Sequence, residues 1–441
     1  MDSEHKLGLA FQGGSFLAGA IATGVVTALL REGEFHRATA FSGTSAGALV
    51  AALCWRHKLQ QRTRELPEHL FAQWMANACG LIPNETTATV LKLADRWLLL
   101  NPLYFNLKEL FVVPVMHHLF EQWVVEHVEP EAIMAVLFDT YLGEVRDTSG
   151  IGWRRAVEQR YEADEERVTL AIGTAEIESG RVVTIDDLDL FHALVEAYAT
   201  ALDRGLQGAA AREHAVRAAA RYMTLALMTS GSLDTVNGIT RIDTVAGIDN
   251  LDRLHRGTYL DGAYSQNPPI APLTKADVDE IWVVEIFPER CDRPLTSNEK
   301  REDRKEELLQ NAPVQHQHQF INNLNFWLKT GRLRELDADE LRRFEERLNS
   351  DADWRNEVID LFKRTTAQPT AWRDEQEVVA AIRQKVRRRY RQIRTRTIAL
   401  PTDLQPLTDA ARIVNSPWFI LYMMLRGYSN TLDFLGEACT E

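Results

Sequence analysis

Cysteine is scarce and scattered in this sequence. The chain of 441 residues contains four cysteines, which are Cys54, Cys79, Cys291 and Cys439. None of them forms a C-x-x-C pair, so the sequence predicts neither a disulfide framework nor a zinc site. We therefore predict no metal, and a reducing, cytoplasmic setting fits this cysteine usage best.

Basic residues are outnumbered as well. The chain has 50 lysines and arginines against 63 acidic residues, a formal net charge of −13. Phosphate backbones require a concentrated basic surface, so nucleic acid is excluded as an expected partner. The motif G-x-G-x-x-G and a Walker lysine are both missing, which argues against a dinucleotide or nucleotide site. No cofactor is predicted, and the sequence carries no signal for the oligomeric state.

No apolar stretch has the length and flanks of a membrane helix. Residues 7–30 are apolar, but the acidic stretch 1–5 precedes them and 12–15 interrupt them. A signal peptide would have a basic start instead. The apolar stretch 417–425, which we expect to form a helix ending at Gly427, is shorter than the ~20 residues that span a bilayer. We expect this helix to pack on the core.

A G-x-S-x-G pentapeptide, residues 43–47, is the most informative stretch that is present. An apolar run precedes it at 38–41, and small and apolar residues follow at 48–53. Strand, tight turn and helix are the context of a nucleophile elbow, which exposes the serine hydroxyl. Ser45 is therefore the candidate nucleophile, and the amide of Ala46 would face an oxyanion at the helix N-terminus. A chance occurrence in a turn is the alternative.

The start of the chain predicts a strand–loop–helix unit. Residues 7–11 form an apolar strand, and the turn 12–15 precedes a helix at 18–31. Consecutive amides in such a loop can bind an anion. The loop is thus an oxyanion loop, a phosphate loop or a packing feature, and this stretch alone does not distinguish them.

Further along, Asp261 lies at the end of a predicted strand, within the glycine turn of 257–263. Most Asp-Gly pairs are only turns. Between the elbow and this turn, 168–173 and 180–185 predict neighbouring strands, and 209–228 predict a long helix. The run 281–287 predicts another buried strand.

In order and spacing, Gly13-Gly14, the pentapeptide and Asp261-Gly262-Ala263 resemble the motifs of the patatin-like phospholipase family over roughly 7–287. The resemblance implies a three-layer α/β/α domain with a mainly parallel central sheet. It implies a serine lipid acyl hydrolase that cleaves carboxylic esters of phospholipids or related acylglycerols with a Ser-Asp dyad and no catalytic histidine.

Carried onto this chain, the resemblance implies Ser45 as the nucleophile and Asp261 as the base. The amides around Gly13, Gly14 and Ser15 would form the oxyanion hole. The family's loop usually has a third glycine, which is Ser15 here, and then a cation, where Leu17 stands. Backbone amides do not depend on the side chain, but the missing cation puts a phosphate-bearing substrate in doubt.

The predicted organisation is an acyl hydrolase domain at 1–293, followed by a mainly helical C-terminal region at 294–441. The segment at about 56–160 is predicted to be a helical insertion over the site, with core helices of the domain as the alternative. In the C-terminal region, one charged helix should begin at Thr296, and Phe320 should lie on the apolar face of another. Eight of the fourteen residues 383–396 are basic. They predict a solvated face or attraction to anionic lipid headgroups, that is, peripheral membrane contact.

Two other functions remain open at this point. Leu17 and the basic run favour a lipid-binding or regulatory protein on a weakened scaffold of the same family. An α/β-hydrolase triad with His316 or His318 as the base is the other alternative. Because Ser45 follows only one strand–helix unit, whereas that fold builds several strands before its nucleophile, the sequence argues against the triad.

Overall fold

The structure is a computed structural model of the chain. It describes residues 5–76, 113–143, 152–164, 166–232, 240–242, 257–287, 298–333, 338–365, 392–400 and 416–438, with a few isolated positions besides. Within the predicted insertion, the apolar stretch 98–105 and the first three residues of the apolar stretch 110–115 lie outside the described residues, as do half of the basic run 383–396 and Thr296. Compact units comprise residues 1–318 with 394–441, and residues 319–393.

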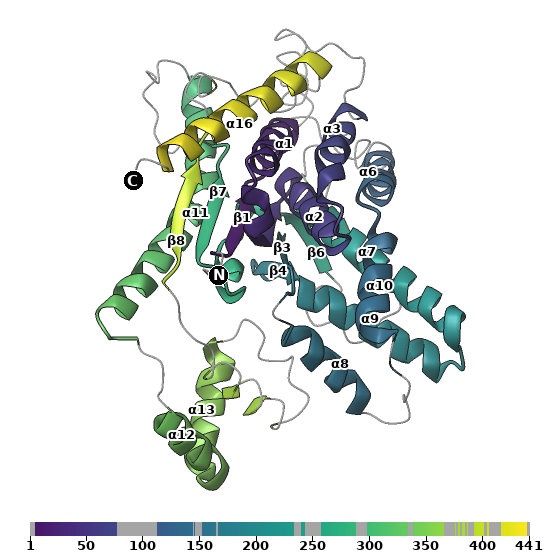
Figure 1. Cartoon of the computed structure of the whole chain (residues 1–441), viewed down its shortest axis with the longest axis vertical. Coiled ribbons are helices and arrows are strands. Elements are labelled where there is room, and N and C mark those ends of the chain that lie inside the picture. The colour runs from purple at the N-terminus through teal and green to yellow at the C-terminus, as the bar shows by residue number, and fades with distance from the viewer. Residues whose placement is uncertain are drawn as a thin grey trace. The chain divides into compact units, whose positions relative to one another are not determined.

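The larger unit is built on a mainly parallel sheet, shown in Figure 1. Its strands are β1 Leu7–Phe11, β2 Ala38–Thr44, β3 Thr169–Glu176, β4 Val182–Asp186, β5 Thr240–Ile242, β6 Gly257–Asp261, β7 Glu280–Val284 and β8 Arg394–Ile398. The order across the sheet is β5-β6-β3-β2-β1-β7-β8, and β4 also pairs with β3. The strands from β3 through β2, β1 and β7 to β8 run parallel, whereas β4 and β6 are antiparallel to β3.

Helices account for most of the remaining described chain. They are α1 Ser15–Arg31, α2 Ala46–Leu59, α3 Leu66–Ala76, α6 Val113–Val128, α7 Pro130–Leu137, α8 Gly152–Glu162, α9 Asp187–Asp203, α10 Gly208–Ser230, α11 Asn298–Lys329, α12 Ala338–Ser350, α13 Ala352–Thr365 and α16 Pro417–Ala438. The chain thus has the predicted fold class, an α/β domain with a mostly parallel sheet and a helical C-terminal region. The described parts of the predicted insertion are helical too.

The order of the central strands explains where α1 and α2 lie. β1, β2 and β3 are neighbours in sequence order, and α1 and α2 connect them. Right-handed crossovers in one direction along a sheet place both helices on the same face. Every residue of β1 and of β7 is buried, as expected for strands covered on both faces.

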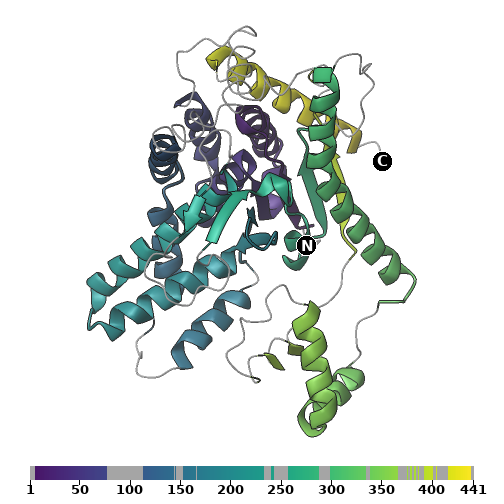
Figure 2. The same ribbon diagram turned by 180° about the vertical axis from the view of Figure 1, so that it is seen from behind.

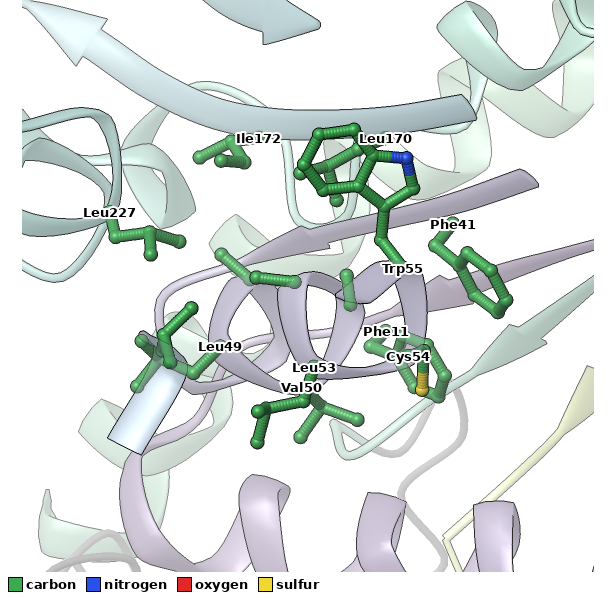
Figure 3. Packing of buried hydrophobic residues seen from close by; sticks show 14 of the residues in the cluster. Phe11, Phe41, Leu49, Val50, Leu53, Cys54, Trp55, Leu170, Ile172 and Leu227 are labelled. Carbon is green, nitrogen blue, oxygen red and sulfur yellow. The ribbon is translucent and has the colours of Figure 1, made fainter. Parts of the chain in front are cut away.

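The core of the larger unit is centred on α2. Figure 3 shows Trp55 of this helix beside Leu170 of β3, with Phe41 of β2 nearby. All three side chains are fully buried. The Trp55 Nε1–H donates to the Val168 carbonyl at 2.7 Å, so even the polar atom of the ring is satisfied. Contacts with β2 and β3 therefore fix α2, the helix that follows Ser45, against the sheet.

The helix α16 packs against α1, as Figures 1 and 2 both show. Contrary to the prediction that it ends at Gly427, it continues to Ala438. The reason is a close crossing of two backbones: a Cβ atom on Gly427 would lie 2.3 Å from the Ile21 carbonyl oxygen, and one on Gly24 would lie 2.0 Å from the Met424 oxygen. Gly427 serves helix packing and not helix termination.

We expect Gly427→Ala to lower the free energy of unfolding by about 1–3 kcal/mol, because the added methyl group must push α16 away from α1. Gly436→Ala is the matched control on the same helix, since a Cβ atom there would meet nothing within 4 Å. Alanine is the better helix former, so the control should be neutral or slightly stabilising. Denaturant unfolding of both variants measures the difference, and equal midpoints would contradict the crossing.

Two features of the C-terminal region differ from the sequence-based prediction or were missed by it. The two helices predicted around Thr296 and Phe320 are one helix, α11, with Pro313 inside it. Asn311 and Val314 on either side of this proline are buried, so tertiary contacts stabilise the helix through the break. The end of the basic run forms the strand β8, in which the Arg396 guanidinium lies over the Phe434 ring, 4.0 Å from its centroid.

The smaller unit has a hydrophobic core of its own. Leu348 of α12 and Ile359 of α13 pack with Val378 and Ile382. None of the described helices of the chain is long and apolar enough to cross a membrane. The predicted domain boundary at 293/294 remains a prediction.

Candidate active site

Ser45 occupies a strained turn between β2 and α2. Its φ of 56° and ψ of −127° lie in a region that residues with a side chain rarely adopt. Such backbone strain costs on the order of 1–3 kcal/mol and persists only where neighbouring structure enforces it. Close packing enforces it here: a Cβ atom on Gly43 would lie 2.2 Å from the Gly47 oxygen, and one on Gly47 would lie 2.2 Å from the Phe11 oxygen.

A second serine, Ser230, fixes the backbone of the turn. The Ser45 amide donates to Ser230 Oγ at 2.9 Å, and this hydroxyl donates to the Gly173 carbonyl at 2.7 Å. Ser230 is fully buried at the last position of α10. The sequence indicated only a helix end there, so this contact had no local signal. As a consequence, the amide of Ser45 itself is not free to bind a substrate oxygen.

Asp261 reaches the same place from the end of β6. In the sheet, Thr174 of β3 pairs with Asp261, and Gly173 pairs with Thr44, which precedes the elbow. Only β3 therefore separates the ends of β2 and β6, and residues 45 and 261 meet across it. The Thr44 hydroxyl also donates to the Gln266 carbonyl at 2.7 Å, which connects the two turns directly.

The Asp261 carboxyl group is completely buried. Its Oδ1 accepts from the Ala263 amide at 2.8 Å, while the buried Oδ2 takes no hydrogen bond of ordinary geometry from the described residues. Burial raises the pKa of Asp261 from 3.8 to about 7, and the Ala263 amide and the Ser45 side chain act in the opposite direction. The structure thus places Ser45 beside a buried carboxyl group whose pKa is raised by its surroundings.

The glycine loop, residues 13–15, lies directly beside the elbow, residues 43–47. A Cβ atom on Gly13 would be 2.7 Å from the Thr44 oxygen and 2.9 Å from Ser45 Cβ. The Gly13 amide donates to Asn267 Oδ1 at 2.5 Å and is therefore already engaged. Within the described chain, the amides of Gly14 and Ser15 have no hydrogen-bond acceptor.

At the start of α2, the amide of Ala46 likewise has no acceptor among the described residues. Leu17, at the position where the family usually has a cation, is 2% exposed and belongs to the core under α1. The site therefore offers three backbone donors close to Ser45, and Leu17 contributes only to packing.

The histidines considered from sequence do not take part in the Asp261 environment. His316 is exposed on α11, and His318 Nε2 lies 4.0 Å from Glu285 Oε1. Ala263 and Ser45 are the groups that oppose the effect of burial on the pKa of Asp261, and no histidine contributes. Across the described ranges, no group of three or more His, Cys, Asp or Glu side chains could hold a metal ion.

Fold and site together define an α/β protein with a serine at a strand–helix elbow and a buried carboxyl group beside it. The model of the family Patatin-like phospholipase matches residues 9–274, more than half of the chain. The chain belongs to the patatin-like phospholipase family, as its three motifs predicted. Members of this family are generally lipid acyl hydrolases, so a lipid substrate is consistent with membership.

Other comparisons add little. A search of the curated proteins found no significant match. Among solved structures, the crystal structure of VipD from Legionella pneumophila matches with 13% sequence identity and a TM-score of 0.27. The match covers 96% of this chain and 67% of that chain. A TM-score at this level does not indicate a shared arrangement of the whole chains.

Proposed function

We propose that this protein is a serine lipid acyl hydrolase of the phospholipase A or esterase type, with Ser45 as the nucleophile and Asp261 as its base. The observation that carries the proposal is the fully buried Asp261 carboxyl group beside Ser45: burial raises its pKa to about 7, and the Ser45 side chain opposes this shift. A serine hydroxyl is a weak nucleophile until a neighbouring base takes its proton. A carboxylate with a raised pKa is a stronger base than an exposed one.

In the first step, Ser45 Oγ attacks the ester carbonyl carbon while its proton passes to the Asp261 carboxylate. The tetrahedral intermediate then collapses: the bond to the alcohol oxygen breaks, and the leaving alcohol takes the proton from Asp261. The acyl group stays on Ser45. In the second step, a water molecule gives a proton to Asp261 and attacks the carbonyl carbon of the acyl-enzyme. The bond to Ser45 Oγ then breaks, Ser45 takes the proton back from Asp261, and the fatty acid leaves.

The amides of Gly14, Ser15 and Ala46 would stabilise the negative charge on the carbonyl oxygen by donating hydrogen bonds to it. They lie at the beginnings of α1 and α2, where the partial positive charge of a helix accumulates. Each donor of this kind contributes ~3–4 kcal/mol to the transition state in enzymes where one was removed. The Gly13 amide, which the sequence-based set included, already donates to Asn267, so we leave it out.

Activity should rise with pH through about 7. Only the ionised form of Asp261 can accept the Ser45 proton, and burial raises its pKa to about 7. We therefore expect kcat/KM for a soluble ester to increase about tenfold per pH unit below this value and to level off above it. Initial rates between about pH 5 and pH 9 measure the profile. A rate that is constant or falling across this interval would contradict Asp261 as the base.

Carboxylic esters of phospholipids or acylglycerols are the proposed substrates. Leu17 supplies no cation to the site, so a neutral acylglycerol fits the loop as well as a phospholipid does. Peripheral membrane contact through the basic run stays a prediction, because most of residues 383–391 lie outside the described chain.

Fluorophosphonate labelling of the native protein tests the proposal. We expect a single covalent adduct, mapped to Ser45 by peptide mass spectrometry, and release of fatty acid from mixed phospholipid vesicles. Folded protein without an adduct and without turnover on any ester would refute the hydrolase proposal. Saturable vesicle binding in that case would favour the lipid-binding alternative.

A further inference from the structure

Helix α11 reaches the proposed site through a set of amide side chains. Gln310, Asn311 and Gln317 lie on its first part, which belongs to the larger unit. All three follow residue 274, where the family match ends. Each of them makes hydrogen bonds to loops around Ser45, and no motif in the sequence pointed to them.

Asn311 holds the residue that precedes the glycine loop. Gln12 Nε2 donates to Asn311 Oδ1 at 3.2 Å, and Asn311 Nδ2 donates to the Phe287 carbonyl at 3.1 Å. Gln12 Oε1 accepts from the amides of Ile286 and Phe287 at 2.6 and 3.0 Å. The two side chains and the Phe287 peptide close a ring of hydrogen bonds that is almost completely buried. Buried amides without partners are costly, so this ring has one favoured geometry.

Gln310 contacts the glycine loop indirectly, through the side chain of Asn267. Its Oε1 accepts from Asn267 Nδ2 at 3.0 Å, and Asn267 Oδ1 accepts from the Gly13 amide at 2.5 Å. Asn267 is fully buried, so the bond to Gln310 sets which way its amide points. If the amide turned over, Nδ2 would face the Gly13 N–H, and two donors would be opposed.

Gln317 holds the loop that joins Asp261 to β7. Its Oε1 accepts from the amides of Ile270 and Ala271 at 2.6 and 3.0 Å, and its Nε2 donates to the Pro268 carbonyl at 2.9 Å. The same helix thus contacts the loops on both sides of Ser45. Side chains before and after Pro313 of this helix therefore contact the loops that carry the proposed oxyanion donors and the proposed base.

The glycine loop needs such support. Gly14 has a φ of 153° and Ser15 a φ of 58°, both outside the regions that ordinary residues prefer. Strained backbone reverts unless its surroundings hold it. With the Gly13 amide bound to Asn267, the next two amides are the ones left for a ligand.

We propose that Gln310 and Asn311 are positioning residues. Gln310 keeps the Gly13 amide on Asn267, Asn311 fixes Gln12 before it, and together they direct the amides of Gly14 and Ser15 at the carbonyl oxygen of the substrate. The inference rests on the proposed function and deepens it: the hydrolase site extends beyond the family match into α11. Oxyanion donors act mainly in the transition state, so misplacing them lowers kcat more than it raises KM.

Substitutions at Gln310 separate positioning from folding, because this side chain is only half-buried. Gln310→Leu removes the acceptor for Asn267 Nδ2, whereas Gln310→Glu keeps it. Gln315→Leu is the matched control, an exposed glutamine on the same helix. For each protein we would measure thermal unfolding, hydrogen exchange at the Gly13 amide, and kcat and KM per active site as titrated with a fluorophosphonate.

In Gln310→Leu we expect kcat per titrated site to fall about 10–100-fold with KM within about threefold, and Gly13 exchange to quicken about tenfold. Gln310→Glu and Gln315→Leu should stay within about threefold of the parent in both measurements. A merely structural role would reduce the number of titratable sites and leave the turnover of each unchanged, which would overturn the inference. Unchanged Gly13 exchange in Gln310→Leu would overturn it as well.

The failure of this inference can be told from that of the proposed function. A parent protein that does not react with the probe would refute the hydrolase proposal and the inference with it. A reactive parent whose turnover per site equals that of Gln310→Leu would refute the role of α11 alone.

Discussion

Replacing Ser45 with alanine is expected to lower kcat on a lipid ester by at least ~10⁴-fold, the largest effect of any substitution that we predict. The reason is that the acyl group has no other atom to bind in the proposed mechanism, so only background hydrolysis near the oxyanion donors remains. Fatty-acid release from vesicles and fluorophosphonate labelling measure the loss. Both signals should vanish together in the variant.

Ser42→Ala is the matched control for this experiment. Ser42 lies in the same strand, β2, and its buried Oγ has no hydrogen-bond partner among the described residues. Removing such a hydroxyl is neutral or slightly stabilising and should leave the rate within about twofold. Labelling that survives in Ser45→Ala would show that another residue reacts, and the elbow would then be only a structural turn.

Asp261→Asn is expected to lower kcat/KM by about 10³-fold or more, since an amide cannot accept the Ser45 proton. Its shape is that of the carboxyl group, and its Oδ1 can still accept from the Ala263 amide. Labelling by a reactive fluorophosphonate should slow strongly as well. A variant that keeps the rate of the parent at pH 8 would exclude Asp261 as the base.

The same substitution should stabilise the fold at alkaline pH. The pKa of Asp261 is about 7 in the folded protein and near 3.8 when exposed, so ionisation favours the unfolded chain. The resulting penalty is absent below about pH 4, grows between pH 4 and pH 7 and is complete above, where three pKa units correspond to about 4 kcal/mol. Asparagine carries no such penalty. Burying the asparagine amide has a cost of its own, which offsets part of this gain in the free energy of unfolding at every pH.

We therefore expect Asp261→Asn to have a free energy of unfolding higher than that of the parent by about 2 kcal/mol at pH 8.5 and lower than it by about 2 kcal/mol at pH 4, because the offset from the buried amide does not change with pH. Asp187, another buried carboxyl group with a raised pKa, is present in both proteins, so its titration cancels in the difference. Denaturant unfolding at the two pH values measures it. A stability difference that is independent of pH would show that Asp261 is not desolvated as the fold implies.

Short stretches of the sequence predicted many elements of the domain, because apolar runs and turn residues are visible within a few neighbouring positions. The strand 7–11 was predicted with the bounds that β1 has, and the alanine-rich helix predicted at 209–228 is α10. β3 and β4 form the predicted neighbouring strands. The C-terminal elements were predicted less well. β8 lies in a basic stretch whose pairing partner β7 is more than one hundred residues away, and no periodicity reports such a pairing.

What the sequence by itself determined is the set of residue types and turns at which this chemistry can occur: the elbow of 43–47, the glycine loop after β1 and the carboxyl group at 261, and with them the family. Their short motifs are local, since a tight turn needs its own glycines. Only the tertiary structure decided how these parts meet. Burial around Asp261, the bond from the Ser45 amide to Ser230, and the amides of α11 against Gln12 and Asn267 join residues far apart in the chain. Hydrogen bonds between distant polar side chains leave no pattern in a single sequence, so they became visible only in the fold.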